Sequence, residues 1–221
     1  MLDRREARNN PEQGFSLIEL LIAMVITLII MGAAATLLAT SFKIRTRENA
    51  RTDSIADVQR GLNIMAREIA IGGYGFEPVS NGLVAGDCDV SSLRVRSNLN
   101  RYSTGSTTIE SANEDIKYLI DTTNGQNYLV RYDKFATGSQ ATVLANRVDS
   151  LALVYWGPGN TALDVTADPS QVVNAIAVRI TVSVNLLAVG TRGSPGYQPA
   201  TTVQLSSDVT LRNKSQNLAN Y

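Results

Sequence analysis

One carboxylate, Glu19, stands inside an otherwise uncharged apolar stretch. No other ionisable side chain occurs between Phe15 and Phe42. An acidic side chain inside a bilayer costs roughly 2.5–3.5 kcal/mol on insertion scales, so its presence indicates a function that compensates this cost. We expect another group to compensate the Glu19 carboxylate. The alternative is a carboxylate that reaches back to the membrane surface.

The remaining composition offers little for catalysis. The chain has no histidine, which removes the usual general base and the commonest metal ligand. Its one cysteine, Cys88, cannot form an internal disulfide and has no second thiol or imidazole as a partner, so we expect it to be inert. Cationic and anionic residues number 20 each, so the chain has no net positive charge that would attract nucleic acid. We predict no catalytic residue, no metal, no cofactor and no direct nucleic-acid partner, and therefore a protein that is not an enzyme.

Carboxylates gather at two places in the second half of the chain, where a calcium site is conceivable because Ca²⁺ takes six to eight oxygen ligands. They are Asp87, Asp89, Glu114, Asp115 and Asp121. The EF-hand spacing, with its central glycine and twelfth-position glutamate, is missing. We therefore expect these groups to be solvated acids in turns.

A polar leader and a membrane-length helix surround Glu19. Residues 1–14 carry both charge signs and a proline, so they cannot bury an apolar face. Leu20 to Ala39 is twenty residues without a charge, and as a helix it spans about 30 Å, the thickness of a bilayer core. The sequence predicts a cleaved leader at 1–14 and a membrane-spanning helix at 15–42.

Cations flank this helix on both sides. Lys43, Arg45, Arg47 and Arg51 follow it, where long side chains could reach lipid head groups. Arginines also precede it in the leader, so the positive-inside rule leaves the orientation open. An ordinary secretory signal, cut after the three alanines at 33–35, is the competing interpretation and predicts a secreted binding domain.

The segment Gly14-Phe15-Ser16-Leu17-Ile18-Glu19-Leu20-Leu21-Ile22-Ala23 resembles the class III signal of type IV pilins and type II secretion pseudopilins. The resemblance implies that a prepilin peptidase cuts between Gly14 and Phe15 and methylates the new Phe15 amine. Glu19 would then pair with that amine on a neighbouring subunit. It also implies other pilins and the inner-membrane assembly platform as partners, with the head in the periplasm.

A second helical segment follows the membrane span. Its apolar residues recur at spacings of three and four, as in an amphipathic helix, at Ile55, Val58, Leu62, Met65 and Ile69. No proline occurs from Phe15 to Glu77, so one helix could run from Phe15 to Ile71, about 85 Å. Glycines at 72, 73 and 75 should end it. We expect an amphipathic stalk and cap at 43–76.

The remaining residues, 77–221, predict a β-rich head and hence an α+β fold. The segments 116–120 and 128–132 flank Asn124-Gly125, a hairpin signal. Further strands are expected at 151–156, where both faces are apolar, at 176–184 with one buried face, and at 203–211. Two polar or glycine-rich stretches, 97–114 and 190–199, predict loops.

Three shorter motifs are similar to PilW-type minor pilins and J-type minor pseudopilins: Met65-Ala66-Arg67-Glu68-Ile69, Ala177-Val178-Arg179-Ile180, and Val209-Thr210-Leu211-Arg212-Asn213. Many major pilins also carry a proline early in the stalk and a cysteine pair near the C-terminus. This chain has neither, which favours a minor subunit. The resemblance implies a minor pilin that supports pilus assembly, and through it adhesion, twitching motility or DNA uptake. A minor pseudopilin of a type II secretion system is the alternative.

Overall fold

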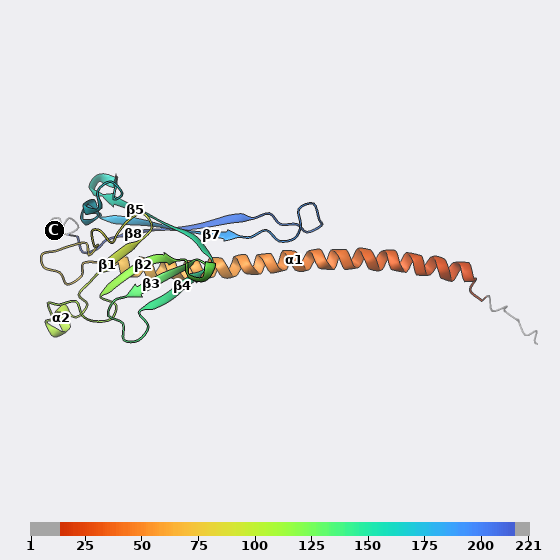
Figure 1. Cartoon of the computed structure of the whole chain (residues 1–221), viewed down its shortest axis with the longest axis horizontal. Helices are drawn as coiled ribbons and strands as arrows, with labels where there is room; N and C mark the ends of the chain where they lie inside the picture. The colour runs from red at the N-terminus through yellow and green to blue at the C-terminus, as the bar shows by residue number, and fades with distance from the viewer. Residues whose placement is uncertain (1–13, 215–221) are drawn as a thin grey trace, which may run out of the picture.

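The computed structural model describes residues 14–214 and is built on one long helix (Figure 1). Helix α1, Leu17–Ala70, has 54 residues and confirms the predicted helix to within two residues at each end. Most of its apolar first half projects from the head, whereas its second half packs against two β-sheets. The α+β architecture predicted from the sequence is thus confirmed.

The first sheet is antiparallel, with strand order β1-β2-β3-β4. Its strands are β1 (Leu93–Arg96), β2 (Asp115–Asp121), β3 (Tyr128–Asp133) and β4 (Ala141–Asn146). The predicted hairpin is confirmed as β2 and β3, and Asp121 pairs with Tyr128 at its closed end. Its connection contains a 3₁₀ turn, Thr123–Gly125, in which Gly125 takes a left-handed φ of 71°. The expected loop at 97–114 contains one short helix, α2 (Arg101–Thr104).

The second sheet is also antiparallel, with order β6-β5-β7-β8. Its strands are β5 (Val148–Gly157), β6 (Thr161–Leu163), β7 (Ala177–Leu186) and β8 (Thr201–Thr210), with 3₁₀ turns at Pro158–Asn160 and Pro169–Asn174. The expected strands at 176–184 and 203–211 are confirmed as β7 and β8. In β5 only one of the two apolar faces is buried: Tyr155 is inaccessible, whereas Val154 is 39% exposed. Within residues 14–214 no layer of the head covers that second face.

The predicted stripe of α1 supplies one side of the core. Val58, Leu62, Met65 and Ile69 are each at most 5% exposed, and Ile55 is half-buried. They face side chains of both sheets, because α1 packs on β4 at one side and on β7 and β8 at the other. Burying such side chains stabilises a fold by about 1.5–3 kcal/mol each, so the stalk half of α1 is held mainly by this stripe.

A polar cluster also fastens α1 to the first sheet. The Glu68 carboxylate accepts hydrogen bonds from the Tyr118 hydroxyl and from Arg131 Nε, the latter at 2.9 Å. Tyr118 is fully buried, so its hydroxyl needs this acceptor. The cluster fixes the position of the helix along the sheet.

The end of α1 is closed by glycine and by the C-terminal segment. Gly73 has a φ of 76°, and a Cβ there would lie 1.8 Å from the Ser80 carbonyl oxygen, so only glycine fits. The Arg212 amide donates to the Ala70 carbonyl at 3.2 Å, and Asn213 Nδ2 donates to the Ile71 carbonyl at 3.1 Å. These bonds satisfy carbonyls that a helix end leaves unpaired.

Candidate functional site

The expected cleavage point lies just before α1. Gly14 and Phe15 precede the first helical residue, and Phe15 is 81% exposed. Ser16 takes the N-cap position with an extended ψ of 143°. A peptidase could therefore reach the bond between Gly14 and Phe15. Residues 1–13 of the expected leader lie outside the described residues.

Glu19 lies in the first turn of α1, where the positive end of the helix dipole favours a carboxylate. Ser16 and Glu19 have the spacing of a capping box, but the Ser16 side chain makes no capping hydrogen bond. The Glu19 side chain is exposed, and no cation lies within ion-pair distance of it among residues 14–214. The carboxylate is thus open to a neighbouring molecule, one helical turn from Phe15.

The first half of α1 is long and apolar enough to cross a membrane, and none of that segment is buried by the head. Its large apolar side chains are extensively exposed, for example Leu17 at 82% and Leu37 at 71%. Together with the signal reported below, this supports a single-pass membrane anchor.

The loop between β7 and β8 runs back along α1 toward this anchor (Figure 1). We name residues 187–200 the membrane-proximal loop. The guanidinium of Arg47 holds its two ends, donating to the Leu187 carbonyl at 3.1 Å, to the Gln198 carbonyl at 3.2 Å and to Thr201 Oγ1 at 2.9 Å. Arg47 is only 7% exposed, so the expectation that it reaches lipid head groups is wrong.

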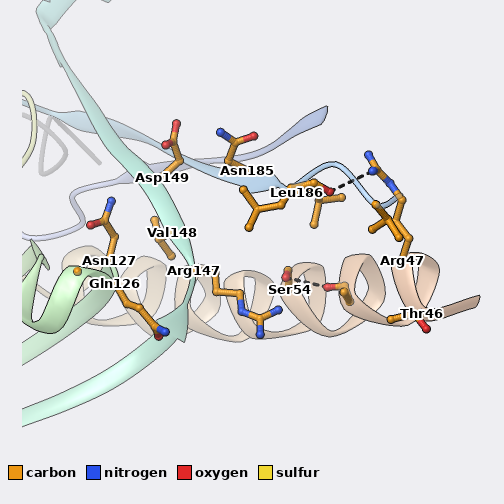
Figure 2. A pocket seen from close by; sticks show the side chains of 14 residues that line it. Thr46, Arg47, Ser54, Gln126, Asn127, Arg147, Val148, Asp149, Asn185 and Leu186 are labelled. Atoms are coloured by element: carbon orange, nitrogen blue, oxygen red, sulfur yellow. Dashed lines mark hydrogen bonds between the residues drawn. The ribbon is translucent and has the colours of Figure 1, made fainter. Parts of the chain in front are cut away.

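A groove of about 670 Å³ opens between α1 and the membrane-side ends of the two sheets (Figure 2). Its floor includes Ala50 and Ser54 of α1, and its opposite wall includes Val148 and Leu186. Figure 2 shows Arg47 at one end of the groove and Arg147 between it and Gln126 and Asn127 at the other end. Nothing in the sequence predicted this groove, because its walls are far apart in the chain.

The acidic side chains considered as calcium ligands are engaged by the protein itself. Asp87 accepts hydrogen bonds from Lys117 and Arg94, which hold its pKa below the usual value. Burial raises the pKa of Asp115, but hydrogen bonds and charges of Arg94 and Arg96 outweigh it and leave the pKa lowered. In the part of the chain that the structure describes, no three acidic, histidine or cysteine side chains converge as metal ligands would.

Two further buried groups have structural partners. Glu114 is 1% exposed, and its carboxylate accepts four backbone N–H bonds, the shortest from Ser111 at 2.8 Å. Cys88 is buried, and this burial raises the pKa of its thiol, which disfavours the reactive thiolate.

One family model matches the N-terminal part of the chain, where the membrane helix begins. Residues 9–35 match the family model described as a prokaryotic N-terminal methylation motif. The search of curated proteins returns no match to the chain. The motif is a prepilin-type signal, which implies processing by prepilin peptidase and assembly with other pilins. It covers the region in which Gly14, Phe15, Glu19 and the exposed apolar helix lie together, and it supports a type IV pilin-like protein, either a pilin or a pseudopilin.

Proposed function

We propose that this protein is a minor pilin of a type IV pilus. The prepilin peptidase cuts between Gly14 and Phe15, and the Phe15 amine is methylated. The helix holds the subunit in the inner membrane with its head in the periplasm, and then packs into the filament or its initiating tip complex. The observation that carries this proposal is the anchor itself, a projecting apolar helix whose only charge is the exposed Glu19.

Glu19 supplies the recognition step in this proposal. Cleavage creates a cationic amine at Phe15 that must enter the apolar interior of a helix bundle. A carboxylate of an adjacent subunit neutralises it, and an uncompensated member of a buried pair costs about 3–5 kcal/mol, which enforces the register between subunits. The carboxylate lies in the first helical turn and has no ion-pair partner within residues 14–214.

A minor pseudopilin of a type II secretion system is the second candidate. It needs the same signal and the same anchor, so the features that support the pilin assignment support it equally. The absence of a stalk proline before Glu77 and of a second cysteine, which many major pilins carry, favours a minor subunit. Affinity purification from crosslinked membranes separates the two, because major pilin is recovered in one case and the secretion pseudopilins in the other.

The first experiment is the N-terminal mass of the mature protein from cells with and without the prepilin peptidase. We expect a chain that begins with N-methylated Phe15 and that disappears when the peptidase is deleted. A Gly14→Val variant should keep its leader, whereas Gly32→Val, in the membrane span, should be cut normally. A mature N-terminus near Thr36 in both strains would instead establish a secreted domain and overturn the proposal.

A further inference from the structure

The membrane-proximal loop descends to the point where the helix leaves the bilayer. A Cβ on Gly196 would lie 2.9 Å from Thr40 Cγ2, so the loop backbone touches the helix there. Arg47, about two turns further along the same helix face, binds the ends of the loop. The loop is therefore fixed against α1 from Arg47 down to Thr40.

Thr40 directly follows the uncharged run from Leu20 to Ala39. As a helix this run is about 30 Å long, which fills the hydrocarbon core of a bilayer. The head-group layer adds several ångströms on each side. Since the loop backbone touches Thr40, the tip of the loop lies at the depth of the head groups.

Free cations gather at this depth. Arg192 lies within residues 190–197, the tip of the loop beyond the Val189–Gln198 bridge. Arg192 and Arg45 are exposed, and Lys43 is half-exposed. Within residues 14–214 none of the three has a hydrogen-bond or ion-pair partner, whereas the nearest acidic side chain in the helix, Glu48, already faces Arg51 at 3.8 Å. The loop and the adjoining helix turn therefore present uncompensated positive charge.

We propose that the membrane-proximal loop binds anionic phospholipid head groups, with Arg192 acting together with Lys43 and Arg45. The contact gives the head a second point of attachment to the membrane besides the helix. A single helix leaves the head free to rotate about the membrane normal, and two attached points fix that rotation. The inference rests on the membrane anchoring of α1 and holds for a pilus or a secretion subunit alike.

The continuity of the surface with the anchor favours lipid over a soluble polyanion. The helix spans the bilayer, and the loop touches its last apolar turn, so head groups are the anions that are always adjacent. Each cation near an anionic surface contributes about 1 kcal/mol, equivalent to roughly a fivefold change in an equilibrium. Arg192 alone should therefore give a measurable effect.

The test uses the full chain in nanodiscs of phosphatidylcholine, with or without phosphatidylglycerol. We expect hydrogen exchange of the loop amides to be about fivefold slower in the anionic discs, and the difference to shrink as salt is raised. Arg192→Gln should abolish the difference, and Arg192→Lys should retain most of it. Lys134→Gln is the control. Lys134 is exposed and follows the end of β3 that is farther from the groove, so this variant should behave as the wild type.

Two outcomes would overturn the proposal. Loop amides that exchange at the same rate in neutral and anionic discs would show that head-group charge is not recognised. A difference that persists in Arg192→Gln would place the lipid contact elsewhere on the molecule. Because exchange is read amide by amide, unfolding of a variant would appear in the strands as well and would not be mistaken for either result.

Discussion

The guanidinium of Arg47 donates a hydrogen bond of 3.1 Å to the carbonyl oxygen of Leu187, a residue 140 positions later in the chain. The other two acceptors of Arg47, the Gln198 carbonyl and Thr201 Oγ1, are also neutral. No carboxylate lies within ion-pair distance of Arg47 among the described residues. This buried cation is thus stabilised by backbone and hydroxyl dipoles alone, and its contribution is to join the membrane-proximal loop to α1.

Removal of the Arg47 side chain should release this loop. Hydrogen bonds to a charged group stabilise a fold by about 1.5–3 kcal/mol each. Removing the guanidinium also removes the free-energy cost of burying its charge, which offsets part of this loss. For Arg47→Ala we expect exchange of the amides at 188–198 to accelerate at least tenfold, while β5 and β7 keep their protection. Arg67→Ala removes an exposed arginine of the same helix that makes no hydrogen bond or ion pair within residues 14–214, and it is the matched control. Unchanged exchange in the loop of Arg47→Ala would mean that other contacts hold it.

Two glycines of the same loop distinguish backbone strain from packing. Gly193 and Gly196 have left-handed φ angles of 86° and 76°, so alanine costs about 1–2 kcal/mol at either position. At Gly193 a Cβ meets no atom within 4 Å, whereas at Gly196 it would lie 2.9 Å from Thr40 Cγ2 and 3.2 Å from its Cα. Gly196→Ala should therefore loosen the loop more than Gly193→Ala does, as measured by hydrogen exchange. Equal effects would contradict the contact with Thr40.

Two buried tyrosines should make the head sensitive to alkali. Burial raises the pKa of Tyr118 well above its usual value of 10.0, and the adjacent Glu68 charge raises it further. Burial also raises the pKa of Tyr155, whose hydroxyl donates to the Asp89 carbonyl at 3.0 Å. A pKa that is higher in the folded state stabilises the protein fully below pH 10, and this stabilisation is lost as pH rises further.

The free energy of unfolding should accordingly fall above pH 10, by up to about 1.4 kcal/mol per pH unit for each tyrosine. Denaturant unfolding of the detergent-solubilised protein at a series of pH values measures this slope. Tyr155→Phe should reduce the slope, although it also removes a hydrogen bond at neutral pH. The exposed Tyr102 provides the control, and Tyr102→Phe should keep the wild-type slope. A slope that is the same in Tyr155→Phe and the wild type would count against the buried tyrosine as its cause.

The sequence predicted those parts of the fold that depend on near neighbours in the chain. The stripe of α1 follows from helical spacing, and the β2–β3 hairpin follows from two alternating segments around a glycine turn. The division into two sheets depends instead on the backbone at Arg147, between β4 and β5, where φ is 58°. Arginine gives no local signal for that conformation, so the sequence could not reveal the division.

For the candidate site, the sequence could propose Gly14, Phe15 and Glu19 because their spacing and the lack of other charges are local features, and their roles stay a prediction. It interpreted Arg47 wrongly because position after an apolar run is typical of a cation at the membrane surface. Two of the three acceptors of Arg47 are backbone carbonyls. Every residue has a backbone carbonyl, so the residue types at those positions do not reveal the contact. No sequence pattern marks a carbonyl that will accept from a particular arginine, and so the docked loop could not be anticipated.

Glu19 carries the decisive prediction for assembly. Its removal leaves Gly14 and Phe15 in place, so Glu19→Ala should still be cut and methylated, as the N-terminal mass will show. Incorporation into filaments, measured as the ratio of sheared to membrane-bound protein, should fall more than 100-fold, because an unpaired amine in the bundle costs about 3–5 kcal/mol. Glu19→Gln keeps the size and loses the charge, and it should fail similarly if charge is the cause.

Glu48→Ala is the matched control, since Glu48 belongs to the same helix, is exposed and lies outside the membrane span. It should assemble as the wild type does. Normal incorporation of Glu19→Ala would remove the carboxylate from subunit recognition and leave only the apolar helix to direct packing. Failure of Glu19→Ala with success of Glu19→Gln would assign the role to hydrogen bonding, because the amide can still accept from the Phe15 amine but cannot neutralise it.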